Sequence, residues 1–311
     1  MSDGPAPLDY ALLTVGAANF AMSFMLTKVG LGVGTVDVGG AGFAPVTFVA
    51  LRLLIASAVL WIAMRMVGAA LPPAADREAW WLVVGTALFG NALPFGLITW
   101  GQEVVPANLT AILVAVMPLT TVVLAHLVGD ERLTPFAIGG CVLGLAGVAV
   151  LMGWDALALV GDDAWRQWAV VGAAVSFAVN AVLMRRMRGR SMRAMSFGMI
   201  AVAFAMMAPL ALLLDGLGPM PDAAAWWALL AAGLFPTAIG TLIIINITKR
   251  AGAPFLGQIN FLVPVFGVAF AALFLGEAIE ARAGIALVLI LAGIAVTRIR
   301  RAPRTIARGR A

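Results

Sequence analysis

The segments WWLVVGTALF at residues 80–89 and WWALLAAGLF at residues 226–235 decide the fold, because the second repeats the first at an offset of 146 residues. The same offset pairs Pro118 with Pro264 and Glu131 with Glu277. Between residues 80–150 and their counterparts it gives 20 identities in 71 positions without a gap. Apolar composition alone would give about seven. The chain therefore contains an internal repeat.

The repeated segments belong to an unusually apolar chain. Of its 311 residues, 63% are hydrophobic and 11% are charged, whereas soluble domains carry about 25% charged residues. A membrane-spanning helix needs about 20 largely apolar residues. Ten segments qualify, and the acidic residues lie outside them or at their ends: 10–27, 45–64, 80–100, 107–127, 135–153, 167–184, 194–214, 226–247, 254–275 and 282–299. The longest connection, from Lys28 to Ala44, is expected to be an external loop.

The repeat and the spans together predict an inverted architecture. Residues 1–153 and residues 154–297 each hold five spans, and residues 298–311 form a basic tail. Because five is odd, the second repeat enters the membrane from the opposite side. We therefore expect an all-α integral membrane protein built from two inverted five-helix repeats, as in many secondary transporters.

The basic residues predict which side each loop occupies. With the N-terminus in the cytoplasm, the cytoplasmic segments hold sixteen Lys and Arg residues, and the opposite side holds only Lys28, Arg166 and Arg282. The positive-inside rule then favours two cytoplasmic termini in a plasma membrane, the inner membrane of a bacterium. Basic loops and tail are expected to contact anionic lipid rather than nucleic acid.

Several motifs resemble the EamA-type repeat of the drug/metabolite transporter superfamily. They are Leu51-Arg52-Leu53, Val105-Pro106-Ala107, Pro118, the segment 129–135 and Leu145-Ala146-Gly147-Val148, with a second copy at Ala253, Pro264, Gly276-Glu277 and 291–295. The resemblance implies a ten-helix basket with a central cavity lined mainly by its first, third, fourth, sixth, eighth and ninth helices. It also implies export of amino acids, related metabolites or drugs.

One feature departs from the small four-helix multidrug relatives in this superfamily. Those relatives carry a membrane-embedded glutamate on the first helix, where this chain has Asn19. No carboxylate lies deep in any predicted span, and a proton-coupled carrier usually exposes an ionisable group within the membrane. We therefore expect facilitated diffusion or exchange, with proton passage through Glu103 or His126 as the alternative.

Large polar side chains inside the spans are the candidates for binding a solute. They are Asn19, Asn91, Asn180, Asn246, Gln258 and Asn260, together with Trp100 near the end of its span. Such amides either line a neutral cavity or join helices through hydrogen bonds. Trp100 is either an interfacial anchor or part of an external gate.

Arg52 is the one charge well inside a span, so it is either functional or caps and joins helices. The repeat-matched Pro118 and Pro264 are candidate hinges, or they simply shape the helices. Gly140 and Gly144 are spaced for close helix contact, within the chain or at a dimer surface.

The cysteine and histidine counts limit catalysis. One cysteine, Cys141, and one histidine, His126, cannot build a multi-residue metal or catalytic site, so we expect no metal, no cofactor and no enzyme activity. The predicted function is transport, most plausibly export, of small polar or zwitterionic metabolites such as amino acids. The alternatives are a multidrug efflux carrier and a non-transporting scaffold; the chain could act as a monomer or a homodimer.

Overall fold

The computed structural model describes residues 6–33, 41–128, 134–157, 163–187, 190–216, 218 and 220–298. Its elements are all helical, and the predicted fold class is confirmed. The helices are α1 (Pro7–Gly30), α2 (Pro45–Met66), α3 (Arg77–Ala87), η1 (Leu88–Ala92), α4 (Leu93–Gly101), α5 (Ala107–Val114), α6 (Met117–Leu127), α7 (Pro135–Leu157), α8 (Asp163–Arg185), α9 (Met192–Leu214), α10 (Ala223–Ala232), η2 (Gly233–Ile239), α11 (Gly240–Arg250), α12 (Ala253–Leu256), α13 (Ile259–Leu275) and α14 (Ala281–Arg298).

These helices form the ten predicted spans. Eight continuous stretches are long and apolar enough to cross a membrane. Two shorter apolar helices, Ile259–Leu275 and Ala281–Thr297, correspond to the ninth and tenth predicted spans. Four spans are interrupted: α3, η1 and α4 make the third, α5 and α6 the fourth, α10, η2 and α11 the eighth, and α12 and α13 the ninth. The predicted end of the first span before Lys28 is wrong, because α1 continues to Gly30 and holds Lys28 in its last turn.

The two halves start equivalent helices in the same way. Asp76 caps α3 by accepting the Ala79 N–H at 3.0 Å, and Asp222 caps α10 by accepting the Ala225 N–H at 2.7 Å. Both pairs lie 146 residues apart. The π-helices η1 and η2 interrupt the same part of each repeat. The local sequence therefore gives the equivalent helices α3 and α10 the same N-terminal cap, and it places a π-helix at the same position in each half.

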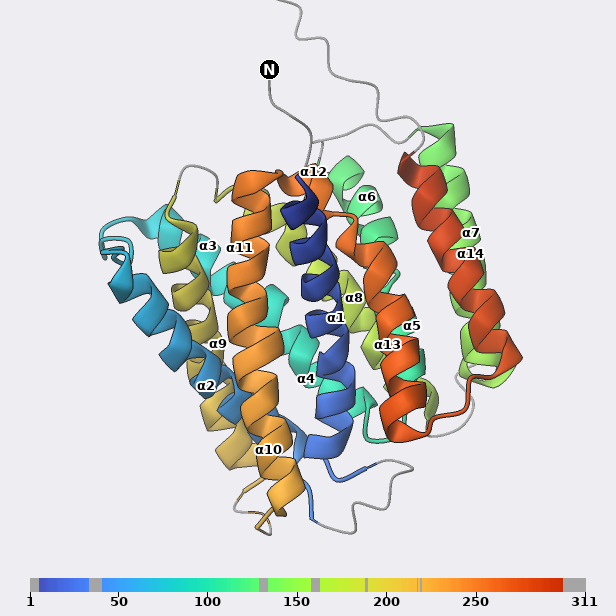
Figure 1. Ribbon diagram of the computed structural model, residues 1–311, viewed down its shortest axis with the longest axis horizontal. Helices are drawn as coiled ribbons and strands as arrows, with labels where there is room; N and C mark the ends of the chain where they lie inside the picture. The colour runs from blue at the N-terminus through green and yellow to red at the C-terminus, as the bar shows by residue number, and fades with distance from the viewer. Residues whose placement is uncertain are drawn as a thin grey trace, which may run out of the picture.

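The equivalent spans run in opposite directions. In Figure 1, α3 leads downward into α4, whereas α10 leads upward into α11. The N-terminal end of α1 and the C-terminal end of α14 lie at the same side of the bundle. Both features are consistent with inverted repeats. We call this side, where α8 ends at Arg185 and α11 ends at Arg250, the basic face, and the other side the opposite face.

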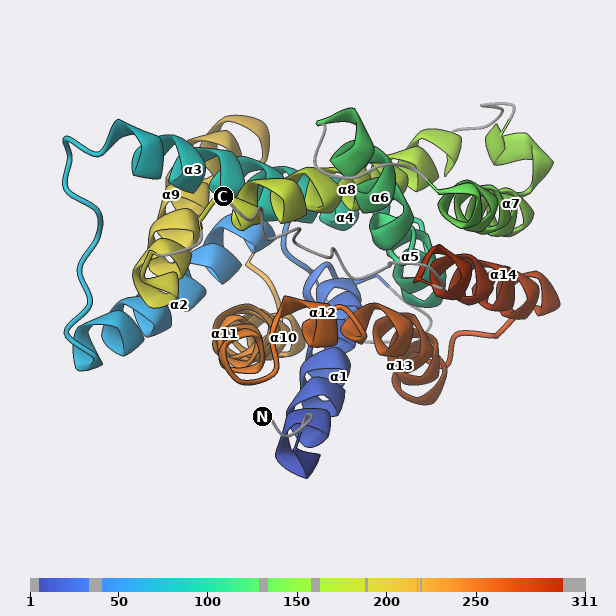
Figure 2. The same ribbon diagram turned by 90° about the horizontal axis from the view of Figure 1, so that it is seen from above.

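Helices α7 and α14 pack against each other at one edge of the bundle (Figures 1 and 2). They meet at glycines: a Cβ on Gly140 would lie 2.5 Å from the Gly293 carbonyl oxygen, and one on Gly293 would lie 2.6 Å from the Gly140 oxygen. Gly144 leaves room for Leu119 of α6. Packing within one chain thus accounts for Gly140, Gly144 and Gly293.

Large apolar side chains cover much of the outer surface. Trp81, Trp227, Leu213 and Leu273 are each more than 70% exposed. Such a surface would associate in water but suits lipid tails. The chain is a multi-pass membrane protein.

Candidate functional site

A cavity of about 790 Å³ lies between the two halves and extends to the basic face. Helix α6 of the first half forms one wall, and α8, α9, α11 and α13 of the second half form the others, with Thr297 of α14 at the rim. These helices surround the centre of the view in Figure 2. The cavity reaches from Met117, Asn180 and Thr241 inside the bundle to Arg185 and Lys249 at the basic face.

The cavity walls combine apolar and neutral polar groups. Six methionines supply flexible apolar surface: Met117, Met184, Met187, Met192, Met195 and Met199. Amides and hydroxyls lie among them, including Asn180, Asn260, Ser196 and Thr241. The charged residues of the described lining are Arg185, Arg190 and Lys249, all cationic. The cavity therefore suits a solute with an apolar part and hydrogen-bonding groups.

Of the predicted site residues, Asn180, Asn260 and Pro118 line the cavity. Asn180 packs against Gly90 of η1, where an added Cβ would lie 2.7 Å from the Asn180 Oδ1. That Oδ1 is buried and has no hydrogen-bond partner among the described residues. Asn260 donates to the Gly257 carbonyl at 3.2 Å, at the break between α12 and α13. Both amides therefore combine a structural contact with exposure to the cavity.

The remaining predicted amides lie outside the residues that line this cavity. Asn19 donates to the Phe235 carbonyl in η2 at 2.8 Å, and Asn91 lies close to the Thr86 carbonyl at 3.4 Å. Asn246 donates to Leu242 of its own helix, and its side chain is exposed like that of Gln258. Asn19 therefore joins α1 to η2, as expected of a residue that holds helices together, whereas the Asn91 bond stays within its own span, beside η1.

Trp100 and Pro264 also lie away from the cavity lining. Arg166 of α8 stacks on the Trp100 ring with its Cζ 4.2 Å from the centroid, donates to the Trp100 carbonyl, and pairs with Glu103. These contacts join the two halves at the opposite face. Pro264 is buried inside α13.

Arg52 is buried, with 3% of its surface exposed, and connects three helices. Its Nε donates to the Thr237 Oγ1 in η2 at 2.7 Å, and its Cζ lies 4.3 Å above the Phe95 ring of α4. Thr237 in turn donates to the Ala232 carbonyl, which lies just before η2. These contacts agree with the interpretation that Arg52 joins helices beside an interrupted one.

A carboxylate from the second half joins the two halves at the opposite face. Glu277, in the connection between α13 and α14, accepts the backbone N–H of Ala107 at 2.8 Å and of Asn108 at 2.9 Å. It therefore caps the first turn of α5, where a negative charge is favoured. The Asn108 side chain donates to the Ala278 carbonyl, and buried Lys28 contributes an attractive charge beside Glu277. We call Glu277, Asn108 and Lys28 the outer closure.

A family comparison identifies the chain. The model of the EamA-like transporter family matches residues 10–153 and again residues 165–299. The chain belongs to the EamA-like transporter family. The resemblance inferred from the repeat motifs is thereby confirmed.

Two curated relatives of this EamA-like transporter cover most of its length. An "Uncharacterized transporter YvbV" of Bacillus subtilis is 26% identical over 70% of this chain and 72% of its own. A "Probable terminal-alkyne amino-acid exporter" of Streptantibioticus cattleyicolor is 28% identical over 85% of this chain and 84% of its own. A solved structure described as "Crystal structure of protein" matches with a TM-score of 0.65 and 21% identity, over 94% of this chain and 97% of that one. This last likeness shows the fold alone.

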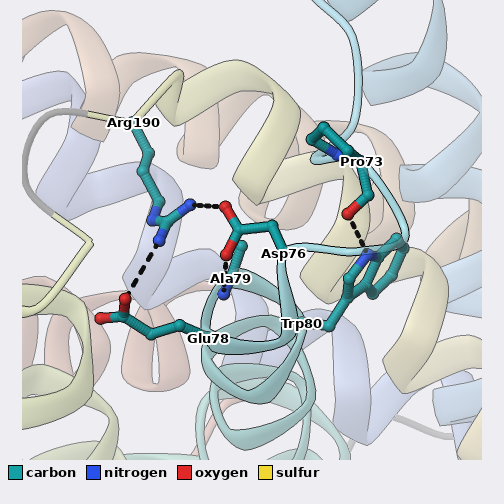
Figure 3. A network of polar contacts seen from close by, with 6 residues as sticks. All are labelled: Pro73, Asp76, Glu78, Ala79, Trp80 and Arg190. Carbon is teal, nitrogen blue, oxygen red and sulfur yellow. Dashed lines mark hydrogen bonds and ion pairs between the residues drawn. The ribbon is translucent and has the colours of Figure 1, made fainter.

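At the basic face of this EamA-like transporter, an ion-pair network joins the halves (Figure 3). Arg190, between α8 and α9, pairs with Asp76 and approaches Glu78 at 3.6 Å. Arg190 and Asp76 also line a smaller pocket of about 220 Å³ next to the main cavity. The Arg190 guanidinium and, to a lesser extent, the Ala79 N–H hold the pKa of the Asp76 carboxyl below its usual value.

Asp76→Asn is expected to lower the melting temperature at neutral pH, because asparagine still caps α3 but no longer attracts Arg190. The pKa of Asp76 is depressed in the folded state, so its stabilising contribution is present above the pKa of the unfolded chain and disappears as the pH falls through the folded pKa. The difference in melting temperature between the wild type and Asp76→Asn should therefore become smaller at acidic pH. Asp222→Asn, at the equivalent cap, is the matched control and should show a smaller effect at neutral pH. Equal shifts for both variants would exclude the ion pair as the cause.

Proposed function

We propose that this chain exports small zwitterionic metabolites, amino acids among them, by exposing one cavity alternately to each side of the membrane. The cavity carries the proposal: it lies between inverted halves, extends to the basic face and offers Asn180 and Asn260 among methionines. The outer closure separates it from the opposite face. A carrier of this kind opens one side only after it closes the other.

The solute class is supported by the chemistry of the walls and by one relative. Amides and hydroxyls pair with the ammonium and carboxylate groups of a zwitterion, and methionines accept varied side chains. The printed name of the Streptantibioticus relative, at 28% identity, describes a probable amino-acid exporter. The six methionines also suit a multidrug carrier, but the Lys249 ammonium at the mouth of the cavity favours anionic groups over cationic drugs.

The proposed orientation places the basic face and both termini in the cytoplasm of a bacterial inner membrane. Reporter fusions at Arg301 and within residues 185–193 are expected to report the same, cytoplasmic side, because basic segments remain there. Fusions within residues 276–280, between α13 and α14, should report the other side. Opposite results for the tail and the 185–193 segment would contradict the four spans predicted between them, and with them the ten-span map.

Transport is tested with proteoliposomes loaded with a panel of labelled amino acids and, separately, with cationic dyes. We expect saturable, counterflow-stimulated movement of an amino acid, without accumulation driven by an imposed pH gradient. Ala181→Trp, which places a large ring in the cavity wall, should abolish the flux, whereas Leu213→Trp on the lipid-facing surface should not. Flux of dyes alone would favour the multidrug alternative, and no flux of any solute would favour a scaffold.

A further inference from the structure

The Arg52 guanidinium is a buried positive charge without a counterion among the described residues. Its contacts are one neutral hydroxyl, Thr237, and one aromatic ring, Phe95. A buried cation is costly unless an anion and further hydrogen bonds compensate it. Arginine offers five N–H donors, and the bond to Thr237 uses only one of them. Joining helices would not require a permanently charged side chain. The charge therefore suggests that an anion binds to Arg52 in another state of the protein.

Two independent chains of contacts place Arg52 about one helical turn beyond the inner end of the cavity. On one route, Thr241 lines the cavity, its hydroxyl donates to the Thr237 carbonyl at 2.6 Å, and the Thr237 hydroxyl accepts from Arg52. On the other, Asn180 lines the cavity and Phe177 lies three residues before it on α8. The Phe177 ring packs edge-on against Phe95, with centroids 6.1 Å apart.

An aromatic layer separates the guanidinium from the cavity. Phe95 lies directly against Arg52, and the chain of ring contacts continues from Phe95 to Phe177 and on to Phe20 and Phe24 of α1. These rings come from α1, α4 and α8, so they belong to both halves. Arg52 and Phe95 belong to the first half, whereas Phe177 and Thr237 belong to the second. A relative movement of the halves therefore parts Phe95 from Phe177 and Arg52 from Thr237, and so changes the access from the cavity to the guanidinium.

We propose that Arg52 is the carboxylate-binding residue of the transport site, shielded from the cavity by the Phe95–Phe177 contact in the present conformation and made accessible as the halves part. The substrate class that follows is a solute with a carboxylate, because a planar guanidinium binds a carboxylate through two parallel hydrogen bonds. This inference rests on the proposed transport function. It names the residue that binds the carboxylate, and it predicts that solutes without a carboxylate are not transported.

The test uses counterflow of labelled L-leucine, or of whichever amino acid the wild-type protein moves fastest. In the wild type, 4-methylpentanoate should compete, whereas L-leucinamide, which lacks the carboxylate, should not. Arg52→Gln should raise the KM about ten- to a hundred-fold, the loss expected for a charged hydrogen bond. Arg52→Lys should retain part of the affinity, because it keeps the charge but loses the paired geometry. Arg65→Gln, an exposed position on the same helix, should leave KM unchanged.

The possible outcomes separate this inference from the function on which it rests. Absence of counterflow in the wild type contradicts the proposed function. Counterflow that L-leucinamide inhibits as well as 4-methylpentanoate does overturns the carboxylate assignment, and this comparison needs no variant to fold. If Arg52→Gln lowers the melting temperature and the amount of folded protein while KM stays at the wild-type value, Arg52 joins helices only, and the inference is wrong.

Discussion

Gly140→Val is expected to prevent stable packing of α7 against α14. A valine Cβ at this position would lie 2.5 Å from the Gly293 carbonyl oxygen and 2.6 Å from the Thr297 Cγ2. The first contact is with backbone, so no change of side-chain rotamer relieves it, and the two helices must separate. Overpacking in a tightly packed interior costs about 1–3 kcal/mol, and a backbone collision lies at or above the upper end. The melting temperature in detergent should fall sharply, with much of the protein aggregated.

Gly139→Val is the matched control for this prediction. It changes the neighbouring residue of the same helix by the same atoms, yet a Cβ on Gly139 meets nothing within 4 Å. Both variants lose glycine's flexibility equally, so their difference isolates the contact with α14. Equal melting temperatures and equal yields of monodisperse protein for the two variants would show that α7 and α14 do not approach each other in this way.

Glu277→Ala is expected to disrupt the outer closure and to slow transport by at least tenfold. The substitution removes the carboxylate that accepts the N–H groups of Ala107 and Asn108 at the start of α5. A hydrogen bond to a charged group contributes about 1.5–3 kcal/mol. The substitution also leaves Lys28 without its neighbouring negative charge. A loss of about 3 kcal/mol from one conformation changes the ratio of two conformations by roughly a hundredfold. The chain should then remain open at the opposite face, and the cavity should seldom face the basic side.

The shift in conformation is measured by thiol labelling in a Cys141→Ala background. Ser23→Cys places a nearly isosteric thiol on a buried position of α1, about one turn before Lys28. A membrane-impermeant reagent added at the opposite face should label this cysteine faster when Glu277 is also alanine. Glu280→Ala is the control, because Glu280 is exposed and pairs only with nearby Arg282 among the described residues. Unchanged labelling together with normal transport would mean that Glu277 is not part of a closure.

The sequence predicted the spans and the repeat because both depend on local composition. Apolar length defined the ten helices, and the offset between Trp80 and Trp226 revealed the inverted halves. The same repeat would also have revealed the paired caps Asp76 and Asp222, had the comparison begun a few residues earlier. Such features are encoded within a few turns of the chain, so they do not require knowledge of the tertiary structure.

The site was harder to predict because its contacts join residues distant in sequence. Asn180 and Asn260 were recognised as polar residues in apolar spans, but the same signal also selected Asn19 and Asn91, whose amides face backbone carbonyls at the π-helices. The contact from Arg52 to Thr237 spans 185 residues, and the cap of α5 by Glu277 spans 170. The methionines of the cavity resemble those of any membrane helix. Pro236 in η2 was the one local signal of a disrupted helix beside Arg52.

Two-sided access to the cavity tests the central claim, that one cavity between inverted halves serves both sides of the membrane. A single cysteine at Thr121 of α6, in the Cys141→Ala background, lies in the cavity wall. We predict that an impermeant thiol reagent labels it from either side of oriented proteoliposomes, and that a transported amino acid slows labelling from both. Labelling from the basic face alone, in protein that still transports the amino acid, would contradict the account, because the solute would then cross by another route.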